Sequence, residues 1–305
     1  MISSEEIKQL RQKPTTELVA QAMAAKLAWR GRSFSFCSII NAKSGKCSED
    51  CRYCAQSSHY RTDAPIYPLK DTKEVVTAAR AAQQAGAHRF SLVTSGRGLP
   101  AAEEAAVMAI IAEIRAQVGI KVCGSFGIAT AATLSRFKAA GMSRYHHNLE
   151  TSERFFPQVT TTHDYADRIA TIRAAQTVGL EVCAGGIFGL GETEEDRIDM
   201  ALALRELAVD SVPLNMLIPL PGTPLAGFRP LAVSEIVRSI ALYRLLLPGV
   251  CIRLAGGREE ALKDFLAAAF LAGADGMMIG GYLTQKGRSV QADRRFAAEI
   301  IELWS

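Results

Sequence analysis

The chain has 305 residues, of which 49% are hydrophobic and 22% charged, so it can bury a large core in one α/β barrel or in two ordinary domains. The formal net charge is +4 and no run of five like charges occurs, which argues against nucleic-acid and membrane-surface partners but not against an anionic small molecule. The charged N-terminus lacks the apolar segment of a secretory signal and no window of 18 apolar residues occurs, so we expect a cytoplasmic protein without a membrane span.

Short β-rich runs alternate with longer amphipathic stretches along the chain. Eight strands are predicted, at residues 34–40, 88–94, 120–125, 143–149, 180–187, 211–217, 250–255 and 276–279. The stretches between them predict helices at 71–86, 99–119, 130–141, 165–179, 193–208, 232–247 and 259–273. Several helices close on a glycine just before the next strand, at Gly86, Gly119, Gly141, Gly179 and Gly273, which is typical of a left-handed cap joined to a short loop.

This order of elements predicts an α/β protein with a (β/α)8 TIM-type barrel, complete or partly open. Residues 1–30 are predicted to form an N-terminal helical extension. Residues 31–305 are predicted to form one barrel domain, because no linker or low-complexity segment interrupts the repeats. A doubly wound sheet is the alternative, although it usually has fewer strands.

Polar side chains lie within or at the ends of the predicted strands, where a barrel lumen is normally filled by branched apolar residues. They are Arg89, Cys123, His146, Asn148, Glu150, Asn215 and Arg253. Because polar groups that are buried without partners are costly, polar residues on several strands predict a lumen that holds a ligand.

Three of the seven cysteines form a compact motif directly after the first predicted strand. Cys47, Cys51 and Cys54 have the spacing C-x3-C-x2-C, and no fourth cysteine follows nearby. Three cysteine ligands leave one iron of a [4Fe-4S] cluster open, and S-adenosylmethionine can chelate such an iron through its amino and carboxylate groups. A structural zinc site is the alternative, with His59 as its only nearby fourth ligand.

This motif resembles the signature of the radical S-adenosylmethionine superfamily. Tyr53, before the last cysteine, matches the aromatic residue of that signature, and the segment Gly185-Gly-Ile-Phe-Gly189-Leu-Gly-Glu192 is similar to its glycine-rich segment. The resemblance implies that Gly185, Gly186 and Gly189 approach the methionine and adenine parts of the cofactor, which only glycine permits.

Further motifs resemble the biotin synthase family and span most of the chain. They are Asn41-Ala-Lys-Ser-Gly45, Ala55-Gln-Ser-Ser58, Tyr145-His-His-Asn-Leu-Glu-Thr151, Ser211-Val-Pro-Leu-Asn-Met-Leu217, Gly222-Thr-Pro-Leu225 and Arg253-Leu-Ala-Gly-Gly-Arg-Glu259. The resemblance implies dethiobiotin as substrate, a 5′-deoxyadenosyl radical that takes hydrogen from unactivated carbons, and sulfur insertion from an auxiliary iron–sulfur cluster. It also implies a homodimer and a flavodoxin or ferredoxin as electron donor.

The chain departs from the family at the auxiliary cluster, which is usually a [2Fe-2S] cluster on three cysteines and an arginine. Cys123, Cys183 and Arg253 match three of these ligands, but Ser91 stands where the second-strand cysteine is expected. We hypothesise that Cys37, on the neighbouring first strand, replaces that cysteine, and that the auxiliary cluster is of the [2Fe-2S] or the [4Fe-4S] type. Buried structural thiols are the alternative for these cysteines, and Cys251 is interpreted as core.

The resemblance also assigns residues to the substrate and the cofactor. His146 stands where the family usually has asparagine near the ring of the substrate, and Asn148 and Asn215 match its other ring contacts. Asn148 is also assigned to the cofactor. Glu150 replaces the aspartate that the family usually has at the ribose hydroxyls of the cofactor, and Arg168 matches the residue that pairs with the cofactor carboxylate. A solvated helix charge is the alternative for Arg168.

Two other functions stay open at this stage. A related radical S-adenosylmethionine maturase or carbon-skeleton enzyme would share the barrel and the first cluster, and a single cluster per chain would favour it. A non-catalytic iron–sulfur carrier or sensor would need neither the glycine-rich segment nor a polar lumen, and failure to bind S-adenosylmethionine would favour it.

Overall fold

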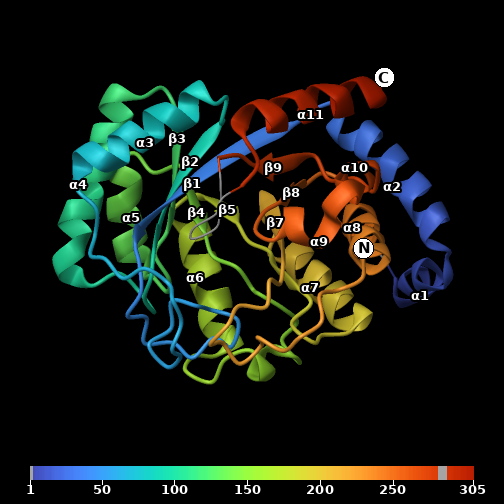
Figure 1. Ribbon diagram of the computed structural model, residues 1–305, viewed down its shortest axis with the longest axis horizontal. Helices are drawn as coiled ribbons and strands as arrows, with labels where there is room; N and C mark the ends of the chain where they lie inside the picture. Colours follow the sequence, from blue (N-terminus) through green and yellow to red (C-terminus); the bar gives the residue numbers. More distant parts are fainter. Residues whose placement is uncertain (1–2, 281–286) are drawn as a thin grey trace.

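The computed structural model describes residues 3–280 and 287–305, which form a closed parallel barrel surrounded by helices (Figure 1). Hydrogen-bonded neighbours follow the order β5-β4-β3-β2-β1-β9-β8-β7-β6, and an additional pairing of β5 with β7 closes the ring. The strands are β1 Ser35–Lys43, β2 Arg89–Thr94, β3 Lys121–Ser125, β4 Arg144–His146, β5 Glu181–Cys183, β6 Gly186–Phe188, β7 Ser211–Met216, β8 Cys251–Leu254 and β9 Gly276–Met278.

The predicted (β/α)8 barrel is confirmed, with two corrections to its strands. The single strand predicted at 180–187 is divided into β5 and β6, and both pair with β7, so they share one stave of the barrel. The strand predicted at 143–149 ends early, at His146. The chain continues beside β5, where the His147 amide donates to the Cys183 carbonyl over 3.0 Å, and reaches Glu150 with a φ of 70°.

The helices match the predictions except near the C-terminus. The predicted helix at 259–273 is broken at Lys263, which has a φ of 46°, and the sequence did not predict the last helix. Gly119 follows an extended Val118 and has no left-handed conformation, unlike the other four closing glycines. The helices are α1 Ser4–Gln12, α2 Thr15–Arg30, α3 Thr72–Gln84, α4 Ala101–Gln117, α5 Ala131–Ala139, α6 Tyr165–Thr177, α7 Glu194–Glu206, α8 Val233–Leu246, α9 Arg258–Leu262, α10 Leu266–Leu271 and α11 Val290–Leu303, with short 3-10 helices at Phe156–Gln158 and Lys263–Phe265. Among these described helices, none has the length and apolar character needed to cross a membrane.

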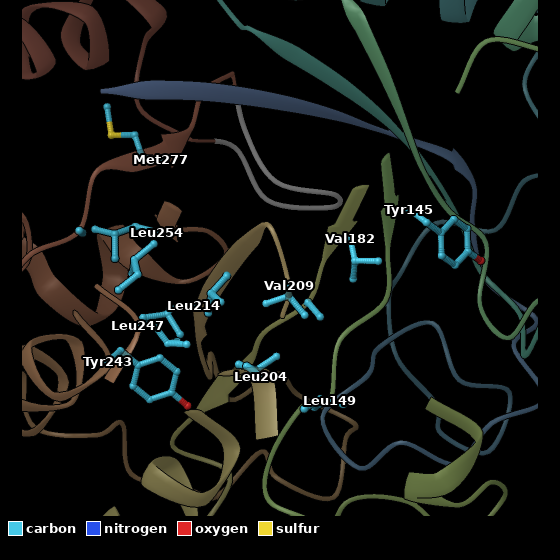
Figure 2. Packing of buried hydrophobic residues seen from close by; sticks show 14 of the residues in the cluster. Tyr145, Leu149, Val182, Leu204, Val209, Leu214, Tyr243, Leu247, Leu254 and Met277 are labelled. Carbon is cyan, nitrogen blue, oxygen red and sulfur yellow. The ribbon is translucent and has the colours of Figure 1, made fainter. Parts of the chain in front are cut away.

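The main core lies between the barrel and its helices. Side chains alternate along a strand, so one set of positions points outward to the helices and the other into the lumen. Val182, Leu214 and Leu254 belong to the outward set and are buried with Leu204 of α7 and Tyr243 of α8 (Figure 2). The apolar outer layer therefore leaves the inward positions of the strands available for polar residues.

The N-terminal helix α2 packs along α8 and is joined to the barrel by buried charges. Arg30 Nε lies 2.7 Å from Asp275 Oδ2, and Arg244 Nη2 lies 3.3 Å from Asp275 Oδ1. Lys26 is fully buried, donates to the Gly31 carbonyl over 2.7 Å and lies over the ring of Trp304 near the C-terminus. Both ends of the chain are thus held against the same side of the barrel.

Burial lowers the pKa of Lys26 from its ordinary value of 10.5 to about 8, although Asp275 acts in the opposite direction. The unfolded chain therefore binds more protons between these two values, and the free energy of unfolding should rise with pH from about 8 to about 10.5. We expect Lys26→Met to lose this part of the rise, as measured by urea unfolding across that range. Lys8→Met, at an exposed position, is the control and should keep it. An unchanged pH profile in Lys26→Met would contradict the assignment.

Candidate active site in the barrel lumen

The barrel encloses a pocket that is lined by residues from every strand. All seven polar residues singled out in the predicted strands lie on it, which confirms that polar side chains from several strands reach the lumen. The lining residues are Cys37, Ile39, Tyr53, Cys54, Arg89, Ser91, Val93, Cys123, Ser125, Arg144, His146, Asn148, Glu150, Cys183, Ile187, Pro213, Asn215, Arg253, Ala255 and Met278.

A second pocket opens at the C-terminal ends of the strands and contains the cysteine motif. Cys47, Cys51 and Cys54 line it together with Arg168 and His163. The two pockets share six lining residues, namely Tyr53, Cys54, Ser125, His146, Asn148 and Glu150. They are therefore adjoining parts of one site, with the cysteine motif at the mouth of the barrel and Cys37, Cys123 and Cys183 deeper in the lumen.

The cysteine loop is fixed by the two acidic residues between its first two cysteines. Asp50 accepts hydrogen bonds from Thr160 Oγ1 at 2.7 Å and from the Thr161 amide at 2.8 Å. Burial alone would raise the pKa of Asp50, but these hydrogen bonds outweigh it and hold that pKa well below its ordinary value. Glu49 Oε2 lies 2.5 Å from His163 Nδ1. Both carboxylates thus bond to the 160–163 segment.

The cysteine motif fits a polynuclear cluster better than zinc. Burial raises the pKa of Cys51 to about 12 and that of Cys54 to about 11, so these thiols need a positively charged group to become thiolate ligands. Across the described residues, no three His, Cys, Asp or Glu side chains converge on a single metal position. Cluster ligands need not converge, since each binds a different iron. His59, the zinc alternative, is exposed and its Nε2 lies 3.0 Å from the Ser48 carbonyl.

Asn148, Glu150 and Arg168 form one buried network beside the cysteine motif. Asn148 Nδ2 donates to Glu150 Oε2 over 3.2 Å, and Arg168 Nη1 donates to the Asn148 carbonyl over 2.9 Å. Arg168 Nη1 also lies 3.6 Å from Glu150 Oε1, while its buried Nε has no partner among the described residues. Arg168 is only 7% exposed, so the alternative of a solvated helix charge is wrong. A buried guanidinium with an unused donor suits a ligand carboxylate.

Gly185 and Gly186 are required by the barrel itself. A Cβ at Gly185 would clash with the Pro213 carbonyl of β7, and one at Gly186 would clash with the Glu150 carbonyl and Met200. The sequence interpretation explained these glycines by the approach of a cofactor. The structure supplies a different reason, because the divided stave lies too close to its neighbours for any side chain. Contact between the cofactor and Gly185, Gly186 or Gly189 stays a prediction.

We expect Gly185→Ala to destabilise the fold by about 1–3 kcal/mol, because the obstructing Pro213 oxygen belongs to backbone and cannot rotate away. Urea unfolding of the cluster-free protein measures this change directly. Gly227→Ala is the matched control, since a Cβ there meets nothing within 4 Å and the residue needs no left-handed conformation. Equal midpoints for the two variants would contradict the packing explanation.

The deep pocket brings together Cys37, Cys123, Cys183 and Arg253, as the sequence hypothesis requires. Burial raises the pKa of Cys37, and that of Cys123 to about 12. Burial also acts to raise the pKa of Cys183, but a hydrogen bond from His146 and the charges of His146 and Arg144 lower it to about 7. Ser91 lies on the same pocket, in register with Cys123.

Arg253 is held in place by the base of the first strand. Its Nη2 donates to Ser35 Oγ over 3.0 Å and to Cys251 Sγ over 3.6 Å, and its Nη1 donates to the Ser35 carbonyl over 3.2 Å. Cys251 is buried but does not line the pocket. This agrees with the interpretation of Cys251 as core.

The predicted substrate residues line the deep pocket, but all three already have partners, and those of Asn148 are Glu150 and the Gly185 amide. Asn215 Nδ2 donates to the Gly186 carbonyl over 3.1 Å, and Asn215 Oδ1 accepts from the Gly256 amide over 2.9 Å. His146 is paired with Cys183 across β4 and β5, and the Cys183 side chain raises the pKa of His146 against the effect of burial. The asparagine therefore joins neighbouring strands, and the histidine turns toward a predicted cluster ligand. Their contact with substrate stays a prediction.

Sequence reasoning missed Arg144 and Glu181, which lie at the N-terminal end of the same lumen. Arg144 lines the deep pocket, and its Nε donates to Glu181 Oε2 over 2.9 Å. Strand alternation could have found Arg144, because it is two residues before His146 and so points the same way. Nothing in the sequence indicates that Glu181 pairs with it, since that contact depends on strand register.

The chain is similar to known proteins over most of its length. The Radical SAM superfamily model matches residues 42–204, and that of the Biotin and Thiamin Synthesis associated domain matches residues 213–300. It is 56% identical over 264 residues to the biotin synthase of Heliobacterium modesticaldum, covering 87% of this chain and 81% of that protein. It is 48% identical over 303 residues to the biotin synthase of Desulforudis audaxviator, covering 98% of this chain and 92% of that protein.

Solved structures with the same fold have much lower sequence identity. Methylornithine synthase superposes with a TM-score of 0.83 at 18% identity, covering 98% of this chain and 93% of that one. The FeFe-hydrogenase maturase HydG from Carboxydothermus hydrogenoformans superposes with a TM-score of 0.80 at 18% identity, covering 95% of this chain and 72% of that one. At these identities the likeness concerns the fold alone.

Proposed function

The chain belongs to the biotin synthase family of radical S-adenosylmethionine enzymes, which insert sulfur in biotin synthesis, and on this basis we propose that its auxiliary cluster is held by Cys37, Cys123 and Cys183. Membership of the family implies a [4Fe-4S] cluster and S-adenosylmethionine. When bound, these groups supply a carbon-centred radical that takes hydrogen from the substrate. The side chains of the two pockets would hold these groups and orient the substrate between them.

At the mouth of the barrel, Cys47, Cys51 and Cys54 would each bind one iron and leave the fourth iron for the cofactor. Arg168 offers its unpartnered Nε to the carboxylate of the cofactor. Glu150 would accept hydrogen bonds from ribose hydroxyls, because its carboxylate lines both pockets. Tyr53 and Asn148, which also line both pockets, complete this set. The observation that best supports this function is that one continuous cavity joins these residues to Cys37, Cys123 and Cys183.

In the lumen, Cys37 compensates for Ser91. Cys37 lies on β1, which pairs directly with β2, so its thiol comes from the strand next to the missing ligand. The register pairs Ile39 with Ser91, which places Cys37 closer to the N-terminal end of the barrel than Ser91. A ligand set shifted in this way alters the space for the cluster. It supports a [4Fe-4S]-type cluster in place of a [2Fe-2S] cluster, with Arg253 beside it.

We propose dethiobiotin as the substrate, bound between the two groups of cysteines. Apolar side chains of Ile39, Val93 and Ile187 line this part of the lumen and suit the carbons from which hydrogen is taken. His146, Asn148 and Asn215 supply the polar groups of the pocket wall that would bind the ring of the substrate. Asn215 already uses one donor and one acceptor, which leaves it one of each for the ring of the substrate.

We also propose an acidic one-electron carrier, a flavodoxin or ferredoxin, as reductant. The carboxylates of Glu49 and Asp50 are engaged by the 160–163 segment, and the exposed basic residues Lys46 and Arg61 flank the cysteine motif in the sequence. A basic surface next to a cluster attracts an acidic protein and speeds encounter.

Cys123→Ala tests the proposed function, because it separates cofactor cleavage from sulfur insertion. We expect 5′-deoxyadenosine to form from S-adenosylmethionine as in the wild type, since Cys47, Cys51 and Cys54 are intact. We expect biotin formation in a single turnover to fall below detection, since the sulfur source is lost. Both products are measured by mass spectrometry. Biotin at the wild-type level would contradict the assignment, and one cluster per wild-type chain would favour a maturase or carbon-skeleton enzyme instead.

A further inference from the structure

An ion-paired group of three side chains closes the N-terminal end of the barrel. Arg89, Arg144 and Glu181 are the first residues of β2, β4 and β5, so they lie at the end opposite the cysteine loop. Arg89 Nη2 donates to Glu181 Oε1 over 2.8 Å and to Oε2 over 2.6 Å, and Arg144 Nε donates to Oε2 over 2.9 Å. Ser143 Oγ accepts from Arg89 Nη1 over 3.1 Å.

This group faces both solvent and the deep pocket. The Glu181 side chain is 37% exposed, whereas those of Arg89 and Arg144 are each 11% exposed. Both arginines line the pocket that holds Cys37, Cys123 and Cys183, and Arg89 Nη1 lies 4.0 Å from Cys123 Sγ. The ion-paired side chains therefore lie between solvent and the proposed auxiliary site. Branched apolar residues would normally fill a barrel at this level.

The charge of the group favours a small anion. Two guanidinium groups share one carboxylate, which leaves one positive charge, and Arg253 adds another deeper in the lumen. Arginine offers several N–H donors in a planar array and keeps its charge when buried. An anion that displaces the Glu181 carboxylate would find donors from both arginines on the path to the cysteines. The opposite end of the lumen adjoins the pocket proposed for the cofactor, so bound cofactor and substrate would obstruct that end.

We propose that Arg89, Arg144 and Glu181 form a binding site and port for the hydrosulfide ion, through which sulfur is resupplied to the auxiliary site from the N-terminal end of the barrel. This rests on the proposed function, in which each product molecule removes one sulfur atom. Hydrosulfide already has the oxidation state of cluster sulfide. Its incorporation at the auxiliary site therefore needs no oxidant or reductant, only the loss of a proton. The two arginines bind the anion, and Glu181 competes with it for them.

The test follows isotopically labelled sulfide into the holoenzyme. Sodium sulfide enriched in sulfur-34 is added with S-adenosylmethionine and dethiobiotin filling the mouth and no reductant present, and labelled acid-labile sulfide is measured by mass spectrometry. The Cys123→Ala protein gives the label taken up by the first cluster alone, which is subtracted. We expect uptake in the wild type to continue with the mouth filled. Uptake that stops on filling the mouth would overturn the proposal, and this comparison needs no variant of the port.

Two variants test the roles of the port residues. Glu181→Gln removes the competing charge and should accelerate labelling about tenfold, whereas Arg144→Met should slow it about tenfold. Mössbauer spectra of the preloaded proteins check that the auxiliary iron is retained. Glu104→Gln is the matched control, because Glu104 pairs with Arg136 between two outer helices, and its labelling rate should not change. A Glu181→Gln rate equal to the wild-type rate would overturn the port.

The same samples separate failure of the port from failure of the proposed function. If single-turnover biotin forms but labelling depends on an open mouth, the function stands and the port is wrong. If the protein carries an auxiliary cluster but forms no biotin, the function is wrong whatever the labelling shows.

Discussion

Replacing Cys37 by alanine is expected to remove about four of the roughly eight irons that the anaerobically reconstituted wild type should bind. The physical reason is that Cys37 is one of three thiols on the deep pocket, and an auxiliary cluster that loses one of three thiolates is held by two cysteines and an arginine alone. Cofactor cleavage should persist, since the cysteine loop is untouched. Iron and sulfide analysis with Mössbauer spectra measures the loss, and biotin formation should disappear with it.

Cys251→Ser is the matched control for Cys37→Ala. Cys251 is a buried cysteine near Arg253 that does not line the pocket, and serine keeps an acceptor for the arginine. It should retain the full iron content. If Cys37→Ala also retained all its iron, Cys37 would be a core residue and Cys123, Cys183 and Arg253 would need another ligand. Ser91 would then be the nearest candidate, because it lies beside Cys123 in the register.

Replacing Cys51 by alanine is expected to abolish cofactor cleavage altogether. Cys51 is 8% exposed and lies at the centre of the motif, and no other cysteine of the loop can take its place. We expect no 5′-deoxyadenosine above the level measured without protein, while auxiliary iron remains in Mössbauer spectra. Cleavage at more than a trace would show that the cofactor does not depend on a cluster at the motif.

Ser48→Ala controls for disturbance of the loop in that experiment. The Ser48 side chain is exposed and bonds only to the neighbouring Glu49 among the described residues, so cleavage should continue at the wild-type rate. The hydrogen bond between His59 Nε2 and Ser48 is accepted by the Ser48 backbone carbonyl and is unaffected by the substitution.

Most of the barrel could be predicted from sequence because its strands and helices differ in the period of their apolar residues. The division of the predicted 180–187 strand into β5 and β6 could not be predicted. The residue that excludes a side chain at Gly185 is Pro213, whose carbonyl lies 28 positions further along the chain. The break at Lys263 was also missed, because an apolar pattern continues across it. Contacts between distant segments decide both features, and no local pattern records them.

Which strand residues point into the lumen could also be predicted from the sequence period. Which side chains they contact there could not be predicted. Strand alternation placed Cys37 on the face of Ile39, and both residues line the deep pocket. The register that joins Arg144 to Glu181 depends on how neighbouring strands are offset, which one sequence does not determine. The turn of His146 toward Cys183 likewise results from the pairing of these two residues across β4 and β5.

The pairing that completes the ring has a mechanical consequence. Between β5 and β7 it consists of a single residue pair, Cys183 with Ser211. An inorganic group bonded to Cys37, Cys123 and Cys183 would connect β1, β3 and β5 across the lumen, next to the one residue pair that joins β5 to β7. The cluster that supplies sulfur would then also stabilise the barrel. Its loss of sulfur in each turnover would lower the stability of the folded barrel until the cluster is restored.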